Sequence, residues 1–166
     1  MIRDAIDADF PAILALNAQS ERFLSPMDVV RLRQLHGAAA CHRVVERDGG
    51  VVAFLLVLRE GADYDSPNYR WFAARYPQFL YIDRVVVAEA EQGRRLGAAL
   101  YDDLFAFARR SGIDTVTCEF DVDPPNEASR RFHARYGFRE VGTQRVAGGS
   151  KQVSLQEAFV GELPDA

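Results

Sequence analysis

The sequence predicts an α/β fold in which a central mixed, mostly antiparallel sheet of six or seven strands is flanked by about four helices. Two patterns carry this prediction. An opening helical region leads into a β-hairpin, and from residue 79 onward strand-like runs alternate with helical ones. With 166 residues and 48% hydrophobic content, the chain is long enough to bury one core. We therefore expect a single domain over residues 1–166.

The opening region predicts a short strand and two helices. After a strand at 2–3, the segment 7–17 offers Asp7 as a capping residue, followed by apolar residues at near-helical spacing. A second helix, at about 27–36, follows a Ser-Pro pair, which favours the start of a helix. Its apolar positions include Val30 and Leu35.

A β-hairpin follows the two helices. Two apolar runs rich in β-branched residues, 41–46 and 51–58, are separated by Arg-Asp-Gly-Gly, in which Asp-Gly favours a tight turn. The second run is apolar on both faces, which is typical of a strand inside a covered sheet.

The segment 59–78 predicts a long connection with a short helix at 69–76. Connections of this length are uncommon unless they are functional, so it is a candidate acceptor loop. Its aromatic residues either form the wall of a pocket, to which nearby acidic residues attract a cation, or fill the core beneath a solvated loop. The aromatic residues are Tyr64, Tyr69, Trp71, Phe72 and Tyr76, and the acidic ones are Glu60, Asp63 and Asp65.

The second half of the chain alternates between strands and helices. A helical stripe of apolar residues runs from Leu96 to Ala108 and ends at Gly112. A shorter helix is expected at 126–136. The expected strands are 79–87, 115–121, 138–145 and 152–159.

Charge and hydropathy argue against nucleic-acid and membrane partners. The formal net charge of −4 gives no overall positive field that would hold a phosphate backbone or an anionic membrane. The first ten residues carry charges where a signal peptide needs an apolar stretch, and the longest apolar run, 51–58, is far too short to span a bilayer. We therefore expect a cytoplasmic protein.

Neither the cysteines nor the histidines form a recognisable reactive or metal-binding pattern. Cys41 and Cys118 lie in separate strands, and Cys118 alternates with apolar residues, so both are expected to be reduced and at least partly buried. The three histidines show no ligand spacing with each other or with the cysteines. We expect no metal.

The turn after the strand 79–87 carries the strongest chemical signal. A glycine-bearing turn that leads into a helix presents unpaired N–H groups and the positive end of the helix dipole, which together suit a pyrophosphate. Arg94 and Arg95 add two cations between Gly93 and Gly97. The alternative is that these glycines serve the turn alone.

Two motifs resemble those of the GNAT acetyltransferase superfamily. In the first, Gln92 and Gly97 match the outer positions of the acetyl-coenzyme A signature, while Arg95 stands where glycine is usual. That fit requires Arg95 to keep helical φ/ψ. In the second, the run 126–138 resembles the family's asparagine, helix, aromatic pair and Gly-Phe. The resemblance implies the GNAT acyl-CoA N-acyltransferase fold.

The resemblance also implies acetyl-coenzyme A as cosubstrate. The main chain of the strand end would pair with the pantetheine arm, and the turn and the helix 126–136 would contact the rest of the molecule. The residues so implied are Val85, Val86, Val87, Gln92, Gly93, Arg94, Arg95, Leu96, Gly97, Ala98, Asn126, Ser129 and Phe132.

A carboxylate on the central strands is the natural base for a charged amine, which must lose its proton before it attacks. Glu119 and Asp83 are the candidates because each stands among apolar or small strand residues. For Asp83 the alternative is an ion pair with an arginine, such as Arg84 of a neighbouring molecule.

The general acid of the family is commonly a tyrosine at the position that matches His133. An imidazolium can also protonate a departing thiolate, so His133 is a chemically competent replacement. The alternatives are that His133 only packs, with water as the proton donor, or that Tyr136 serves instead.

The function predicted from the sequence is transfer of an acetyl group from acetyl-coenzyme A to a primary amine of a small molecule. The amine would attack directly in a ternary complex. Two alternatives stay open: a non-catalytic acetyl-coenzyme A sensor module, and an acetyltransferase acting on protein N-termini or lysines. A homodimer is possible.

Overall fold

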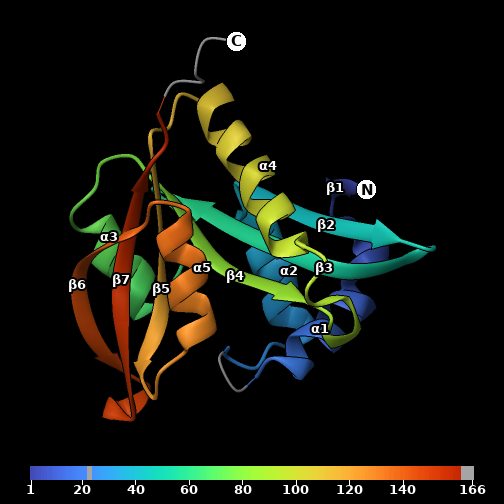
Figure 1. The fold of residues 1–166 in the computed structure, drawn as a ribbon, viewed down its shortest axis with the longest axis horizontal. Coiled ribbons are helices and arrows are strands. Elements are labelled where there is room, and N and C mark those ends of the chain that lie inside the picture. The colour runs from blue at the N-terminus through green and yellow to red at the C-terminus, as the bar shows by residue number, and fades with distance from the viewer. Residues whose placement is uncertain (22–23, 162–166) are drawn as a thin grey trace. The chain divides into compact units, whose positions relative to one another are not determined.

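The computed structural model describes residues 1–21 and 24–161, which form a seven-stranded mixed sheet in the order β1-β2-β3-β4-β5-β7-β6 (Figure 1). The strands are β1 Ile2–Asp4, β2 Cys41–Arg47, β3 Gly50–Arg59, β4 Leu80–Val87, β5 Thr115–Asp123, β6 Arg139–Val146 and β7 Lys151–Phe159. The α-helices are α1 Phe10–Gln19, α2 Val29–Ala38, α3 Pro67–Ala73, α4 Leu96–Arg110 and α5 Glu127–Arg135. The predicted fold class is confirmed.

The pairing of the strands is mostly antiparallel. β2 pairs antiparallel with β1 and β3, and β7 pairs antiparallel with β5 and β6. The parallel pair is β4–β5, in which Leu80 lies opposite Val116 and Tyr81 lies opposite Thr117. The mixed character expected from the alternating second half of the chain thus comes from one crossover through α4.

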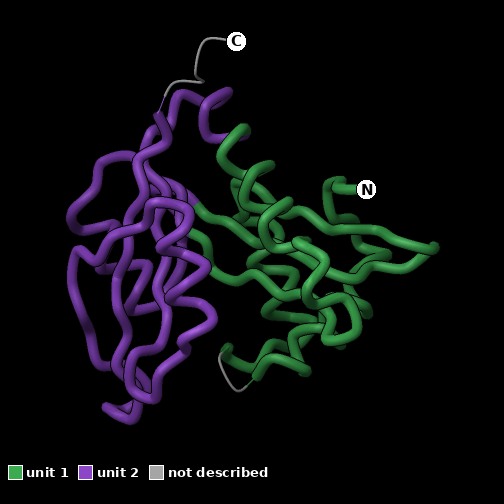
Figure 2. Tube along the Cα trace, in the orientation of Figure 1, with its two compact units in different colours: residues 1–58, 82–106 green, residues 59–81, 107–166 purple. Residues whose placement is uncertain are grey.

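The chain divides into two compact units (Figure 2). Unit 1 comprises Met1–Leu58 and Ile82–Ala106, and unit 2 comprises Arg59–Tyr81 and Phe107–Ala166. Unit 1 therefore holds the opening helices, the hairpin and the turn into α4, while unit 2 holds α3, α5 and the strands β5 to β7. The expectation of a single domain over 1–166 stays a prediction.

In unit 1, the alternation of side chains along β2 places helices on both faces of the sheet. Arg43 faces α4, where its Nε and Nη2 donate to the two carboxylate oxygens of Asp103 at 2.9 and 3.0 Å. The preceding His42 points to the other face, where its Nδ1 lies 2.8 Å from the Nδ1 of His36 on α2. Because successive strand residues point to opposite faces, α2 and α4 cover opposite faces of the sheet (Figure 1).

The start of α1 differs from the sequence prediction. Residues Asp7–Asp9 form a separate 3₁₀ turn, and α1 begins only at Phe10, so Asp7 does not cap the helix. The carboxylate that stabilises this turn is that of Asp9. It accepts two hydrogen bonds from Arg3 at 2.8 and 2.9 Å and one from the Ile6 N–H at 2.9 Å. Asp9 thus ties the 3₁₀ turn to Arg3 of β1, and its side chain makes no capping bond to α1.

The start of α2 follows from the Asp28 side chain, which accepts a hydrogen bond from the Arg31 N–H at 2.8 Å. Leu32 and Leu35 face the core, as expected for Leu35. Val30, which the sequence suggested as a further apolar position, is 61% exposed.

The hairpin turn matches its prediction. Asp48 and Gly49 have φ angles of 51° and 79°, so both central residues are left-handed. This is the backbone of the tight turns that match the twist of the flanking strands, and Asp-Gly is suited to it.

In unit 2, the helix of the segment 59–78 begins earlier than expected. The helix α3 starts at Pro67 rather than 69, because Ser66 caps it through a 3.4 Å bond from the Tyr69 N–H and proline suits the first turn. Tyr69 and Phe72 are 2% and 0% exposed, and the Tyr69 hydroxyl donates to the Arg59 carbonyl at 2.7 Å. These two aromatics therefore fill the core and do not wall a pocket.

The opposite face of α3 is fixed by a close approach to β6. A Cβ built on Gly142 would lie 2.6 Å from Cζ2 of Trp71, so any larger residue there would force the indole to shift. The position follows a register shift between Glu140 and Gly142, which bends the strand at that point.

The buried His42 predicts a loss of stability in mild acid. Burial lowers its pKa to about 4, so the folded protein keeps the imidazole neutral where the unfolded chain protonates it near pH 6.5. The unfolded state then binds more protons as the pH falls from about 6.5 to 4, and stability drops in that window. Urea unfolding should show a free energy of unfolding about 2 kcal/mol lower at pH 5 than at pH 7.

The variant His42→Gln keeps a polar side chain that does not titrate, so its stability should fall by about 2 kcal/mol less over the same interval. The fall that remains includes the contribution of the buried His133, whose pKa is also lowered. An equal fall in both proteins would show that His42 is not the responsible group.

Candidate active site

The turn between β4 and α4 has an unusual backbone. The Ala88 N–H donates to the Val52 carbonyl at 2.8 Å, which ends the strand, and a 3₁₀ turn, Glu89–Glu91, follows. Gly93 then has φ 86° and Arg95 has φ 62°. The two left-handed residues reverse the chain so that it enters α4 directly.

The backbone of Arg95 contradicts the expectation that it keeps helical φ/ψ. Its φ lies in the left-handed region, which a side chain with a Cβ adopts at a cost of roughly 1–2 kcal/mol. Its carbonyl accepts the hydrogen bond from the Ala99 N–H at 3.0 Å, so the residue occupies the cap position of α4. The turn requires a left-handed residue there, which is the reason that glycine suits the position.

The start of α4 has the properties of an anion site. The helix has 15 residues, and the N–H groups of Leu96 and Gly97 at its start have no carbonyl partner within the helix. The aligned peptide dipoles add about half a positive charge at this end. Leu96 and Gly97 are half-buried, whereas Arg94 and Arg95 are exposed beside them. Donors and cations thus converge on one short segment of unit 1.

Glu91 connects this turn to the hairpin. One of its carboxylate oxygens, Oε2, lies 3.4 Å from the Nε of Arg94 and 3.5 Å from Nη1 of Arg47. Arg47 was not among the predicted site residues. It stands 44 positions before Glu91, so only the pairing of the strands brings it there and no sequence spacing points to it.

The predicted pantetheine-pairing segment forms the end of β4. Val86 is 2% exposed and faces the core, while Val85 and Val87 are half-buried on the other face. These three residues and the turn belong to unit 1, so the structure brings together the predicted cofactor residues from Val85 to Ala98.

Asp83 forms an ion pair within its own chain. Its Oδ2 accepts from the Nε of Arg84 at 2.7 Å, and both side chains are about 95% buried. The same guanidinium donates to Asn17 Oδ1 at 2.9 Å and to the Ser25 carbonyl at 3.3 Å. The pairing alternative therefore describes Asp83, with Arg84 as an intramolecular partner and not that of a neighbouring molecule.

Glu119, in unit 2, has a different environment. It is half-buried on β5, and its two carboxylate oxygens lie 3.0 and 2.8 Å from the hydroxyl of Tyr81. Tyr81 is 1% exposed and packs against Tyr69 and Phe72. A neutral phenol held by the core therefore orients this carboxylate.

His133 is 5% exposed on α5 and stacks on Phe120 with ring centroids 5.6 Å apart. Its Nδ1 lies 2.7 Å from the Ser129 carbonyl oxygen, an arrangement in which Nδ1–H donates. Burial lowers the pKa of the imidazole, although the bond to Ser129 opposes the shift. Near neutral pH the ring is therefore mostly uncharged, with Nδ1–H as its donor to the backbone.

The remaining predicted residues of unit 2 lie on or beside α5. The Asn126 side chain accepts from the Ser129 N–H at 3.2 Å and caps the helix. Phe132 and Tyr136 are half-buried with ring centroids 5.1 Å apart. Helix formation alone thus accounts for the Asn126 contact, and the packing of Tyr136 agrees with its place before Gly137.

Cys118 is 2% exposed, and burial raises the pKa of its thiol well above the usual range. Such a thiol is a poor nucleophile. Within the described ranges, histidine, cysteine and carboxylate side chains nowhere gather in groups of three that could hold a metal ion. Over the same residues, no helix combines the length and the apolar character that crossing a bilayer requires.

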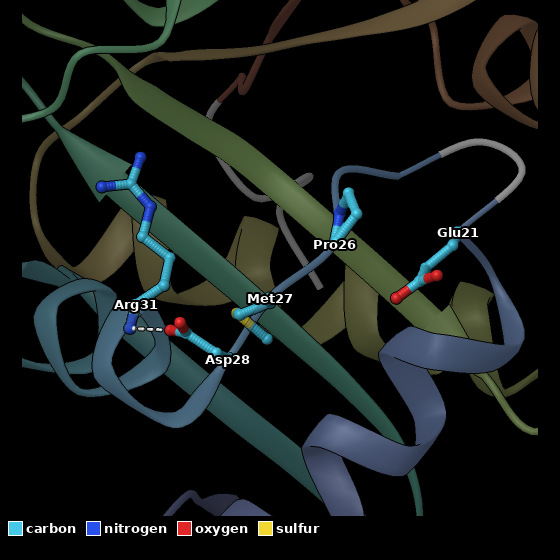
Figure 3. A pocket seen from close by; sticks show the side chains of 5 residues that line it. All are labelled: Glu21, Pro26, Met27, Asp28 and Arg31. Carbon is cyan, nitrogen blue, oxygen red and sulfur yellow. Dashed lines mark hydrogen bonds between the residues drawn. The ribbon is translucent and has the colours of Figure 1, made fainter.

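A hollow of about 320 Å³ lies in unit 1 between the end of α1 and the start of α2 (Figure 3). Glu21 and Arg31 stand on opposite sides of it, with Met27 between them. Pro26 and Asp28 complete the lining. The sequence analysis did not find this site, because its charged residues are spread over a segment without a motif.

The comparison with protein families gives a match over most of the chain. The sequence profile of the Acetyltransferase (GNAT) family matches residues 2–138. Among individual proteins, a phosphinothricin N-acetyltransferase of Streptomyces coelicolor is 46% identical over 64 residues. That match covers 39% of this chain and 36% of the relative, so it spans little more than a third of either.

Solved structures match over nearly the whole chain. Ard1 from Thermoplasma volcanium gives a TM-score of 0.79 at 19% identity and covers 98% of both chains. The yncA protein of Salmonella typhimurium, solved with its cofactor acetyl-CoA, gives 0.73 at 22% identity and covers 100% of this chain and 98% of that one. At these identities the likeness demonstrates a shared fold.

The left-handed Arg95 predicts an unusual order of stability for two substitutions. Arg95→Gly and Arg95→Ala both remove the guanidinium, but only glycine adopts φ 62° without steric cost. After the greater flexibility of unfolded glycine is subtracted, the glycine variant should be more stable by roughly 0.5–1 kcal/mol in urea unfolding.

Arg33, exposed on α2, provides the control. In a right-handed helix the order should reverse, with Arg33→Ala about 1 kcal/mol more stable than Arg33→Gly. If alanine were also the better residue at position 95, the turn would carry no strain.

Proposed function

The chain belongs to the acetyltransferase (GNAT) family, and from this we propose that it transfers an acetyl group from acetyl-CoA to a primary amine of a small molecule. The resemblance found in the sequence is thereby confirmed at the level of the family. The amine would attack the thioester directly, in a complex that holds both substrates.

The observation that carries the proposal is the turn into α4. Acetyl-CoA supplies a thioester activated for acyl transfer and a pyrophosphate that must be held. Two left-handed residues, Gly93 and Arg95, and the N–H groups of Leu96 and Gly97 at the start of α4 form a cradle of donors beside two exposed arginines. The residues present therefore fit a pyrophosphate.

Around that cradle we assign the cofactor-binding residues as the family motifs imply. In unit 1 the main chain of Val85 to Val87 would pair with the pantetheine arm, and Gln92 to Ala98 would bind the pyrophosphate. In unit 2 the corresponding assignments are Asn126, Ser129 and Phe132.

For the base we propose Glu119. An alkylammonium group is mostly charged at neutral pH and must lose a proton to attack. Glu119 is partly exposed and is oriented by the Tyr81 hydroxyl at 2.8 Å, which supports this role. Asp83 is the weaker candidate, because a buried guanidinium occupies one of its oxygens.

For the departing thiolate the candidates are His133, Tyr136 and water. The burial of His133, its lowered pKa and its bond to the Ser129 carbonyl support the packing alternative for this residue. A general acid must carry a proton in the reacting state, and burial disfavours the imidazolium.

A small acceptor is supported by the relative named as a phosphinothricin N-acetyltransferase. The hollow between Glu21 and Arg31 is a candidate place for it, since a carboxylate attracts an amine. A small primary amine as acceptor, a cytoplasmic location and a homodimer stay predictions.

Release of free thiol from acetyl-CoA in the presence of a panel of amines, including phosphinothricin, tests the function. We expect amine-dependent turnover with at least one acceptor. Binding of acetyl-CoA without turnover on any amine, peptide or lysine substrate would favour the sensor alternative.

Two variants then test the roles on β5 and α5. Glu119→Gln should lower kcat by about 10²- to 10⁴-fold, the usual contribution of a general base. His133→Phe preserves an aromatic ring in the same packing, so kcat should stay within about threefold of the wild type. The opposite pattern, a large loss of kcat with His133→Phe and none with Glu119→Gln, would support His133 as the general acid and would remove Glu119 as the base.

A further inference from the structure

We propose that Arg47 supplies a third guanidinium to the phosphate-binding turn and contacts a phosphate group of coenzyme A. The inference rests on the proposed function and adds to it a residue from a separate element of the fold. The family motifs at 92–97 and 126–138 do not include this position.

The β2–β3 hairpin fixes Arg47 beside the turn. Arg47 is the last residue of β2 and pairs with Gly50 across the tight turn of Asp48 and Gly49. The bond from the Ala88 N–H to the Val52 carbonyl joins the start of β3 to the segment after β4. The closed end of the hairpin therefore lies next to Glu89–Glu91, directly before the phosphate-binding turn.

One carboxylate oxygen of Glu91 lies close to the guanidinium groups of two arginines. Its Oε2 is 3.5 Å from Nη1 of Arg47 and 3.4 Å from the Nε of Arg94. The atom is buried, and no hydrogen bond reaches it within the described part of the chain. At these distances the carboxylate orients both side chains by charge, and the two guanidiniums are held on the same side of the turn.

The cluster carries a surplus of positive charge. Two guanidiniums share the single carboxylate of Glu91, while the exposed Arg95 and the exposed Glu89 of the same turn offset each other. Asp48 lies 4.0 Å from the Nε of Arg47, but its side chain is 96% exposed and therefore well screened by water.

The exposure of the arginines suits them to bind a ligand. The side chains of Arg47 and Arg94 are 40% and 52% exposed, so part of each guanidinium group is accessible to solvent. A guanidinium presents five donors in a plane that matches phosphate oxygens. A multiply charged phosphate therefore meets donors and positive charge that the single carboxylate leaves unsatisfied.

Isothermal titration calorimetry with coenzyme A tests this role. Arg47→Gln should weaken binding by about three- to tenfold, as expected for the loss of one charge-assisted contact. The affinity of Arg47→Lys, which keeps the charge but loses the planar guanidinium, should lie between those of the wild type and Arg47→Gln. Arg33→Gln on α2 makes the same change of charge away from the turn and should bind like the wild type. The loss of affinity caused by Arg47→Gln should be smaller in about 0.5 M salt, because exposed charges are screened there. At an ionic strength of roughly this order the Debye length is only a few Å.

Dephospho-coenzyme A, which lacks the 3′-phosphate, identifies the group that Arg47 contacts. An equal loss with both ligands assigns Arg47 to the pyrophosphate, and a loss confined to coenzyme A assigns it to the 3′-phosphate. Either result supports the inference. Thermal unfolding of each variant without ligand confirms that the fold is unchanged, as expected for an exposed side chain.

Unchanged affinity of Arg47→Gln for coenzyme A, in a protein whose wild type binds it, would overturn the inference alone. A wild type that binds no coenzyme A would overturn the proposed function, and the role of Arg47 with it.

Discussion

The backbone of the turn between β4 and α4 is the constraint on which the proposed chemistry depends. A strand that ends at Val87 must reverse within a few residues and enter a helix, and this path places Gly93 and Arg95 at φ 86° and 62°. The same path leaves the N–H groups of Leu96 and Gly97, at the start of α4, without carbonyl partners in the helix. These donors lie close together on one short segment of the chain. A favourable place for an anion thus follows from the way in which strand and helix are joined, before any side chain contributes.

Buried charges hold unit 1 around this turn. Arg84 ties β4 to Asn17 on α1 and to the Ser25 carbonyl before α2, and it is about 95% buried. Removing one partner from a buried ion pair costs roughly 3–5 kcal/mol, so the pair of Arg84 with Asp83 is a structural element of the strand. This commitment of Asp83 distinguishes it from Glu119, whose partner Tyr81 is neutral and belongs to unit 2.

The sequence predicted features that depend on local chemistry. The hairpin at Asp48-Gly49, the Asn126 cap and the helix after the glycine turn each follow from residues that lie next to each other. The errors arose where contacts beyond the immediate neighbours decided. Asp7 does not cap α1, because a 3₁₀ turn held by the pair of Asp9 with Arg3 precedes the helix, and Tyr69 enters the core although it stands in a long connection.

Of the candidate site, the sequence indicated the cofactor turn but not its surroundings. Arg47 reaches Glu91 only through strand pairing, and the hollow beside Met27 is formed by two helix ends without a motif. The left-handed φ of Arg95 was also not foreseen, although the family's usual glycine at this position was a sign of it. Arginine itself carries no such sign, unlike the Asp-Gly pair of the hairpin turn.

The exchange of individual amide protons, followed by NMR with and without coenzyme A, tests the central claim most directly. If the start of α4 binds the phosphates, the N–H groups of Leu96 and Gly97 should exchange about tenfold or more slowly when the ligand is bound, because they then have acceptors. The first turn of α2, at Val29 and Val30, should show no change. Equal exchange at Leu96 and Gly97 with the ligand bound would contradict the account and place the phosphates elsewhere.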